Sequence, residues 1–356
     1  MSLSKRQKLS IFYFEDLPDE ILLKIVSFLN MKGVLQCGQV SKRLRAISND
    51  QCLWLKLNLS GREVPYDFIE KAIQNGCEYL NLGYCHVHRG EKSKMPWKLK
   101  YLEISQSGGY DGEGGYMGLM GLDPGVLENC NVLQKLAMDY LKLDSDEIQQ
   151  ICQNGETLRM LSLEGCSINY DQRTELIQKL FTECHQLTEL NISNPSYPVF
   201  RFEDPHVCAL IDNLTPNILK LNLGYQEGVK DEHVNTLVCK CKKITELNLS
   251  GTSITNNSME SIIKHLNSLE KLDVEHTNID ISTLLKLKSM TTLKILRCFS
   301  QNTDKIKNLK LQLPQVSINE EYLCIACPRK LLDGSIEQDR LWEIRACKYM
   351  FNFNFI

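Results

Sequence analysis

The chain has 356 residues, 43% of them apolar and 24% charged, so its composition is typical of a folded protein rather than a disordered one. Its formal charge of -3 and pI near 6.2 give no overall basic field, which argues against nucleic acid or an anionic membrane as a partner. No apolar stretch approaches the roughly 20 residues needed to span a bilayer. The first residues lack the apolar run of a secretory leader, so the 15 cysteines are expected to be reduced thiols in an intracellular chain.

The first predicted unit spans residues 13–57 and follows a flexible segment, 1–12. Leu17-Pro18-Asp19-Glu20 opens a helical pattern that runs to Leu29, because proline and acidic residues favour a first helical turn. Two shorter helical phrases follow, at 34–40 and 41–47, and the unit ends at Leu53-Trp54. Three short helices cannot bury enough apolar surface to be stable alone. We therefore expect a partner protein to cover part of them, although a simple cap on the following repeats is the alternative.

A repeated phrase of the form L-x-x-L-x-L fills most of the remaining chain. Its spacing lies near the roughly 20–29 residues of leucine-rich repeats, and helical phrases such as 144–152, 231–241 and 256–266 lie between copies. The pattern predicts an α/β fold, a right-handed leucine-rich-repeat solenoid (horseshoe) of about ten repeats over residues 58–318. The middle leucines are Leu57, Leu80, Leu102, Leu136, Leu161, Leu190, Leu221, Leu247, Leu272 and Leu296.

Residues that carry chemistry are sparse. Cys324 and Cys327 form a C-x-x-C pair without a second pair, and no nucleophile motif is recognisable, so we predict no metal, no cofactor and no catalytic residue. The glycine-rich stretch 108–115 lacks the strand and the Lys-Ser/Thr pair of a phosphate cradle, and we interpret it as a surface loop. The cysteines that follow strands or end helices are interpreted as buried packing residues; they are Cys85, Cys130, Cys166, Cys184 and Cys241.

The outward positions of the predicted strands carry polar groups of both signs, which suits a protein ligand. The tail, 319–356, is rich in aromatic residues, and we expect it to pack back on the repeats. The aromatic residues of this tail are Trp342, Tyr349, Phe351, Phe353 and Phe355.

The opening residues resemble an F-box along nearly the whole motif. The resemblance rests on Leu17-Pro18-x-Glu20-Ile21, on Val40-Ser41-Lys42-Arg43 and on Leu53-Trp54, although Leu44 stands where the family often has tryptophan. The order of F-box, cysteine-containing repeats and tail is similar to that of F-box/leucine-rich-repeat proteins. This resemblance implies a non-catalytic substrate-recognition subunit of an SCF (Skp1-cullin-F-box) E3 ubiquitin ligase, which acts by holding a substrate close to the conjugating enzyme. A repeat scaffold or inhibitor outside ubiquitination is the alternative.

The resemblance also implies partners and contact residues. The implied partners are Skp1, through it the cullin and RING subunits, and a protein substrate on the concave face. That substrate is expected to be a phosphorylated cell-cycle regulator, a cyclin-dependent kinase inhibitor presented with a Cks accessory protein, in the nucleus and cytoplasm. The implied Skp1 contacts are Leu17, Pro18, Ile21, Leu22, Ile25, Leu29, Val40 and Trp54. The implied substrate or accessory-protein contacts are Gln226, Asn248, Asp273, His276, Arg297, Tyr322 and Trp342.

Overall fold

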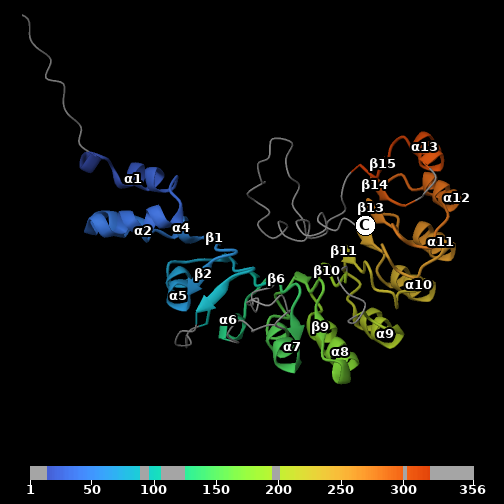
Figure 1. Ribbon diagram of the computed structural model, residues 1–356, viewed down its shortest axis with the longest axis horizontal. Helices are drawn as coiled ribbons and strands as arrows, with labels where there is room; N and C mark the ends of the chain where they lie inside the picture. Colours follow the sequence, from blue (N-terminus) through green and yellow to red (C-terminus); the bar gives the residue numbers. More distant parts are fainter. Residues whose placement is uncertain (1–13, 89–95, 106–124, 195–200, 300–302, 321–356) are drawn as a thin grey trace, which may run out of the picture.

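The structure is a computed structural model that describes residues 14–88, 96–105, 125–194, 201–299 and 303–320. A small helical module lies at one end, and an arc of repeats follows it (Figure 1). The segment 1–12, the glycine-rich stretch 108–115, the Cys324–Cys327 pair, Tyr322 and the aromatic tail with Trp342 lie outside the described residues. No helix in the described ranges is both long and apolar enough to cross a bilayer.

The N-terminal module consists of short helices. Asn30 and Ser41 begin the second and third α-helices, with side-chain oxygens that accept the backbone N–H of Gly33 and Leu44. The sequence predicted three helices, and the structure adds a fourth short α-helix and a 3-10 turn. The α-helices are α1 (Asp19–Val26), α2 (Met31–Val40), α3 (Lys42–Ser48) and α4 (Gln51–Trp54), and the 3-10 turn before them is η1 (Phe14–Asp16).

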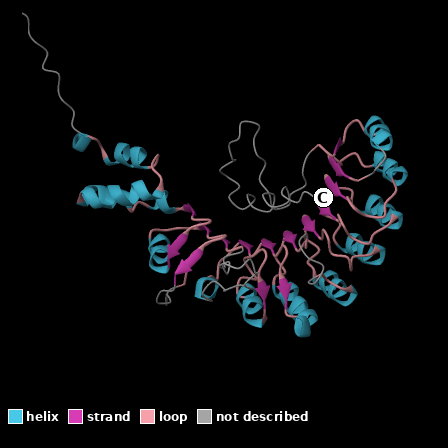
Figure 2. Ribbon diagram, viewed as in Figure 1, coloured by secondary structure: helices cyan, strands magenta, loops and turns pink. Residues whose placement is uncertain are grey.

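An 11-stranded parallel sheet lines the inner side of the arc (Figure 2). The ten middle leucines of the sequence repeat pair in register from each strand to the next, from Leu57 opposite Leu80 to Leu272 opposite Leu296. The predicted repeat register is thus confirmed. The strands are β1 (Lys56–Asn58), β3 (Tyr79–Asn81), β5 (Tyr101–Glu103), β6 (Lys135–Ala137), β8 (Met160–Ser162), β10 (Glu189–Asn191), β11 (Lys220–Asn222), β12 (Glu246–Asn248), β13 (Lys271–Asp273), β14 (Ile295–Arg297) and β15 (Ser317–Ile318).

The sheet has one strand more than the repeat count predicted. Ile318 of β15 pairs opposite Leu296 and takes the place of an eleventh middle leucine. Its signal in the sequence is Leu313-x-x-Val316-x-Ile318, in which valine and isoleucine replace the two leucines. β-branched residues suit a strand as well as leucine does, so the repeat continues through this point.

Helices cover the outer side of the arc (Figure 2). The helical phrase predicted at 144–152 is confirmed as α7, which begins at Ser145: Asp144 accepts the N–H of Asp146 and Glu147, and Glu147 reaches back to the N–H of Asp144. The outer helices are α5 (Tyr66–Gln74), α6 (Gly125–Glu128), α7 (Ser145–Cys152), α8 (Arg173–Glu183), α9 (Asp204–Asn213), α10 (Asp231–Lys240), α11 (Asn256–His265), α12 (Ile281–Leu284) and α13 (Thr303–Gln312), with 3-10 turns η2 (Tyr170–Gln172) and η4 (Leu285–Ser289). Two short strand pairs lie beside them, β2 (Glu63–Pro65) with β4 (His86–His88) and β7 (Lys142–Leu143) with β9 (Ser167–Ile168).

One continuous apolar core runs through the arc between sheet and helices. The five cysteines predicted to be packing residues are all buried in it. Three of their thiols donate to main-chain carbonyls of the preceding repeat: Cys85 Sγ to Leu59 O at 2.9 Å, Cys166 Sγ to Met138 O at 2.9 Å and Cys241 Sγ to Thr215 O at 3.5 Å. Burial raises the pKa of the Cys130 thiol to about 12, so this side chain behaves as a small apolar residue.

Candidate protein-binding surfaces

Helix α1 has two apolar faces, and only one of them is covered. Leu22 and Val26 lie four residues apart on the inner face, where they form a small separate core with Val34 and Ile47. Ile21 and Ile25 lie on the adjacent face, about 100° around the helix, and are 48% and 40% exposed. The α-helical spacing therefore gives this short helix more apolar surface than its own module can bury.

The uncovered apolar row continues beyond the end of α1. Phe28 is 77% exposed and Leu29 is 43% exposed, in the turn that leads to α2. Val40, the last residue of α2, is 75% exposed, whereas Leu17 is half-buried and Pro18 is exposed. We call Ile21, Ile25, Phe28 and Leu29 the exposed row. Phe28 was absent from the predicted contacts, although its position seven residues after Ile21 is the signal that could have identified it.

Two predicted Skp1 contacts, Leu22 and Trp54, are wrong as surface residues because the chain buries them. Leu22 is 1% exposed and belongs to the module's own core. Trp54 is fully buried, donates Nε1–H to the carbonyl of Ser48 at 2.7 Å, and packs against Phe68 of α5 with ring centroids 5.9 Å apart. Trp54 thus joins the module to the first repeat instead of facing a partner.

Arg43 fixes the start of α1 against α3. Its guanidinium donates to Asp19 Oδ1 at 2.7 Å from Nε and to the carbonyl of Leu17 at 2.6 Å from Nη2. The contact holds the Leu17-Pro18 turn in place where the exposed row begins. In this way the exposed row has a defined orientation on the module.

The concave face presents a row of first-position strand side chains that alternate in charge across the middle of the arc. Lys220 Nζ lies 3.6 Å from Glu189 Oε1 and 3.9 Å from Glu246 Oε1, and Lys271 Nζ lies 3.1 Å from Glu246 Oε1. Each cation therefore lies close to a carboxylate on a neighbouring strand. A ligand that binds here must offer both charge signs to compete with these pairs.

The last residues of strands β12 and β13, Asn248 and Asp273, have structural roles, which corrects two predicted substrate contacts. Asn248 Oδ1 accepts the N–H of Ser250 at 2.9 Å, and Asp273 Oδ1 accepts the N–H of Glu275 at 2.9 Å. Both side chains are buried, at 8% and 5% exposure. Asn and Asp stabilise such turns by binding the backbone two residues on. These two residues shape the end of each strand and present little surface to a ligand.

Gln226 is also misassigned as a substrate contact. It is buried, its Oε1 accepts the N–H of Phe202 at 2.7 Å, and its Nε2 donates to the carbonyl of Ile192 at 2.6 Å. The amide therefore ties the segment before α9 to the strand end of the preceding repeat. Sequence alone did not reveal this, because the two partners lie 24 and 34 residues away.

Arg297 and His276 do lie together at the C-terminal end of the sheet. Arg297 Nη2 contacts Glu275 Oε2 at 2.5 Å, and its Nε lies 3.6 Å from Asp273 Oδ2. His276 is exposed and stacks on Phe299, with ring centroids 5.1 Å apart. Burial raises the pKa of Asp273 to about 7. The exposed part of this group is thus the His276–Phe299 stack, which lies near the Arg297 guanidinium that Glu275 pairs with.

An acidic group lies at the ends of β6 and β8; the sequence places its residues, Asp139 and Glu164, at outward polar positions but does not predict their contact. Asp139 Oδ1 accepts Ser162 Oγ–H at 2.6 Å and the N–H of Glu164 at 2.9 Å, while Glu164 Oε1 accepts Tyr140 O–H at 2.6 Å. Desolvation, together with the neighbouring Glu164 carboxylate, raises the pKa of Asp139. These hydrogen bonds connect the segments that follow β6 and β8, so the group stabilises the contact between two neighbouring repeats.

Comparison with known protein families agrees with the observed order of parts. The sequence model described as "SKP2 LRR domain" matches residues 120–349, and the one described as "F-box-like" matches residues 14–60. The chain belongs to the F-box/leucine-rich-repeat family of the SKP2 type. The predicted family resemblance, which the sequence already placed nearest to S-phase kinase-associated protein 2, is confirmed. Members are typically non-catalytic adaptors, and the two matches support an SCF substrate receptor in general terms.

Solved repeat proteins share low sequence identity with this F-box/leucine-rich-repeat chain. An internalin from Listeria monocytogenes is 15% identical, with 82% of this chain and 94% of that chain covered and a TM-score of 0.42. The leucine-rich repeat-containing protein LegL7 from Legionella pneumophila is 12% identical, with 72% and 81% covered and a TM-score of 0.41.

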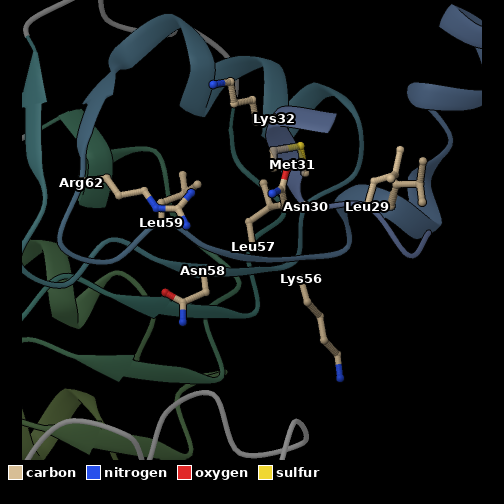
Figure 3. Close-up of a pocket in the computed structure, with 10 residues that line it drawn as sticks. Leu29, Asn30, Met31, Lys32, Lys56, Leu57, Asn58, Leu59 and Arg62 are labelled. Carbon is tan, nitrogen blue, oxygen red and sulfur yellow. The ribbon is translucent and has the colours of Figure 1, made fainter. Parts of the chain in front are cut away.

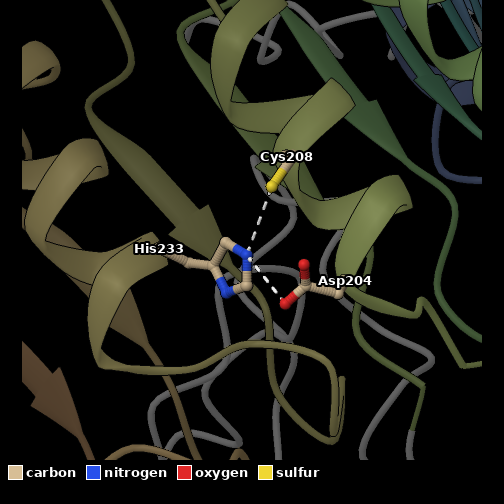
Figure 4. Close-up of side chains that lie close together, drawn as sticks. All are labelled: Asp204, Cys208 and His233. Atoms are coloured by element: carbon tan, nitrogen blue, oxygen red, sulfur yellow. Dashed lines mark hydrogen bonds and ion pairs between the residues drawn. The ribbon is translucent and has the colours of Figure 1, made fainter.

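One group of possible metal ligands occurs within the described residues of this family member: Asp204, Cys208 and His233 (Figure 4). His233 Nδ1 accepts the N–H of Lys230 at 3.1 Å, which leaves the ring proton of the neutral imidazole on Nε2. That same Nε2 faces Asp204 at 3.5 Å, and Lys230 Nζ already binds Asp204 at 2.8 Å. A metal would need the Nε2 lone pair, so this geometry favours a helix cap over a metal site.

Proposed function

We propose that this protein is the substrate-recognition subunit of an SCF ubiquitin ligase, with its N-terminal module bound to Skp1. The observation that carries the proposal is the exposed row on and after α1, of which Phe28 is the most exposed member at 77%. Apolar rows of this kind mark protein interfaces, because water-exposed apolar surface is favourably removed by association. Skp1 would in turn connect the chain to the cullin and RING subunits.

The arc supplies the second half of the proposed role. A receptor forms no bond itself but raises the local concentration of a substrate lysine beside the conjugating enzyme. We propose that a protein substrate binds the concave face, over the alternating row formed by Glu189, Lys220, Glu246 and Lys271. The mixed charge of that row suits a polypeptide that carries both signs and is a poor match for a polyanion.

The finer identity of the substrate is proposed from the family resemblance. It would be a phosphorylated cyclin-dependent kinase inhibitor, presented with a Cks protein, in the nucleus and cytoplasm. His276 and Phe299 offer the most accessible group beside Arg297 for such a contact. Pull-down of the full chain with phosphorylated and unphosphorylated inhibitor peptides, with and without a Cks protein, tests this assignment. Equal capture of the phosphorylated and unphosphorylated peptides, both with and without the Cks protein, would contradict this substrate assignment.

Co-expression with Skp1 tests the main proposal. The full chain should purify as a one-to-one complex with Skp1, and the Ile21→Glu/Ile25→Glu variant should lose the complex. Both side chains are exposed, so the variant is expected to fold. Leu311→Glu is the matched control, because Leu311 is also apolar and 78% exposed but lies on α13, far along the chain. Unchanged complex formation by the α1 variant would reject the proposal.

An observation also favours the alternative role as a repeat scaffold or inhibitor. Trp54 and Phe68 pack the module directly on the first repeat, as an N-terminal cap of a solenoid would. A scaffold of this type would be a soluble monomer that is indifferent to Skp1. The same co-expression experiment therefore separates the two functions.

A further inference from the structure

Two cysteine side chains meet between neighbouring helices on the outer side of the arc. Cys152 is the last residue of α7, and Cys184 directly follows the end of α8. The two helices lie side by side in consecutive repeats (Figure 1). The Cys184 thiol donates a hydrogen bond to the sulfur of Cys152. Neither residue belongs to the exposed row or to the concave face, so the proposed adaptor role does not use them.

The backbone after α7 packs directly on the end of α8. A Cβ atom at Gly155 would overlap the carbonyl oxygen of Glu183, so a side chain there would displace this contact. Lys179 of α8 also donates from Nζ to Oε1 of Gln149 on α7. These contacts keep the ends of the two helices together, which is the condition for a disulfide between them.

The Cys184 thiol differs from other buried thiols of the arc in its partner. Cys85, Cys166 and Cys241 donate to main-chain carbonyls. Cys184 is 1% exposed and donates instead to Cys152, which is half-buried. A thiol that only fills space needs no second sulfur, whereas two adjacent thiols can be oxidised together.

The surroundings of the pair favour ionisation of Cys152. The hydrogen bond from the Cys184 thiol lowers the pKa of Cys152, and the Lys179 ammonium adds to this effect, while burial and the Glu183 carboxylate oppose it. The same hydrogen bond, together with burial, raises the pKa of Cys184. Because the thiolate is the reactive form, Cys152 is the nucleophile, and Cys184 stays a thiol that can react with its oxidised product.

We propose that Cys152 and Cys184 form a site that hydrogen peroxide oxidises to a disulfide, which joins α7 to α8 until a dithiol reduces it. The arrangement is typical of redox-sensing cysteines, in which a reactive, accessible thiol lies next to a second thiol. The site goes beyond the adaptor role, since it needs neither Skp1 nor a substrate.

The reaction takes two steps. The Cys152 thiolate attacks one oxygen of hydrogen peroxide, the O–O bond breaks, and Cys152 becomes a sulfenic acid while the other oxygen leaves as hydroxide and gains a proton to form water. The Cys184 sulfur then attacks the Cys152 sulfur, and the S–O bond breaks. The departing hydroxide takes the Cys184 proton and forms a second water. The two thiols are oxidised and one peroxide is reduced.

Cys52 on α4 provides the comparison within the same chain. It is next to Leu53, which lines a pocket of about 510 Å³ at the junction of the module and the first repeat (Figure 3). Cys52 is exposed, whereas Cys152 is half-buried. Desolvation and the Asp50 carboxylate raise the pKa of Cys52 to about 11. Faster oxidation of the less exposed Cys152 would therefore reflect its surroundings rather than its access to solvent.

Peroxide treatment of the full chain, followed by mass spectrometry of non-reduced peptides, tests the site. The main product should be a linked peptide pair containing Cys152 and Cys184, which dithiothreitol separates. Cys152 should be oxidised at least about tenfold faster than Cys52. In Cys184→Ser, Cys152 should instead accumulate as a sulfenic acid that dimedone traps. Cys166→Ser is the matched control, because it changes a buried thiol that bonds to a carbonyl, and it should leave the linked pair unchanged.

A second pair of variants tests the role of the nearby cation. Lys179→Gln should slow the oxidation of Cys152 by about twofold or more, because it removes a positive charge that favours the thiolate. Lys243→Gln is the matched control, since Lys243 is also exposed and bonds through Nζ to an amide oxygen, that of Asn217. This control should be oxidised at the rate of the parent chain.

Three results would overturn the proposal. Cys152 could be oxidised no faster than Cys52, the main linked pair could involve a different cysteine, or the disulfide could join two separate chains. Cys152→Ser keeps the test valid if Cys184→Ser does not fold, because Cys152 is only half-buried. Cys184 should then stay reduced, and its oxidation at the parental rate would also contradict the proposal.

Discussion

The N-terminal module and the repeat arc differ in how completely they bury their own apolar side chains. In the arc, each strand leucine is covered by the neighbouring repeats and by an outer helix, so the middle leucines from Leu80 to Leu296 are fully buried. In the module, four short helices share a core of only four buried residues, and the apolar row from Ile21 to Leu29 stays exposed. Repetition lets a chain bury its own apolar surface, whereas a short helical unit leaves some for a partner.

The largest expected effect concerns the junction between the two regions. Trp54→Ala should lower the free energy of unfolding by about 3–5 kcal/mol, because it empties a fully buried site that packs against Phe68. Urea unfolding of the full chain measures this. Trp54→Phe keeps most of the packing and should cost less. A stable Trp54→Ala variant would mean that module and arc are not joined through this side chain.

The next effect compares one buried and one exposed apolar residue. Leu221→Ala in β11 should cost about 2–5 kcal/mol of stability, since Leu221 is fully buried in the arc. Ile25→Ala on α1 should change stability by less than about 0.5 kcal/mol, because 40% of Ile25 is exposed. Paired urea titrations check the contrast. Similar losses for both variants would show that the exposed row is covered in solution.

A smaller effect should appear as a pH dependence within the arc. Asp273 is buried and its pKa is raised to about 7, so the folded state binds a proton that the unfolded state releases near pH 4. This contribution to stability therefore falls as the pH rises from about 4 to 7. Asp273→Asn copies Asn248, its register partner. It should raise the free energy of unfolding by about 1–2 kcal/mol at pH 8.

The control for this prediction is the same variant at pH 4, where Asp273 is protonated in the folded protein and the gain should vanish. Thermal melts across this pH range measure both quantities. A gain that is constant with pH, or a loss at pH 8, would indicate that the Arg297 guanidinium 3.6 Å away outweighs burial.

The smallest expected effect lies in the exposed part of the module. Arg43→Ala removes an ion pair with Asp19 and the bond to the Leu17 carbonyl, both at the surface, and should cost at most about 1 kcal/mol. The loss should shrink in high salt. Lys42→Ala is the matched control, because Lys42 is the neighbouring exposed cation and forms no ion pair within the described residues. A large loss for Arg43→Ala would mean that the turn before α1 is essential to the fold.

Much of the arc could be predicted because each repeat carries its own signal. The middle leucines predicted the strand register, and the pattern at 144–152 predicted a helix, since both depend on residues close together in the chain. Ile318 escaped detection only because valine and isoleucine replaced leucine in its repeat.

The candidate sites were harder to predict because they depend on contacts between distant residues. Leu22 and Ile21 are adjacent apolar residues of one helix, and only the fold decides which of them is buried. Gln226 and Asp273 looked like polar surface residues, yet one bridges two segments and the other closes a turn. The spacing of apolar residues predicts that a helix has an apolar face, but it does not predict which of those residues the rest of the protein leaves exposed to solvent.

Calorimetric titration of the full chain with Skp1 at several temperatures tests the central claim most directly. Covering the exposed row should give a one-to-one complex with a clearly negative heat-capacity change, because apolar surface leaves water on binding. The Ile21→Glu/Ile25→Glu variant should show no binding, while Leu311→Glu should behave as the parent chain. Absence of binding by the parent chain, or binding that the α1 variant leaves intact, would contradict the account.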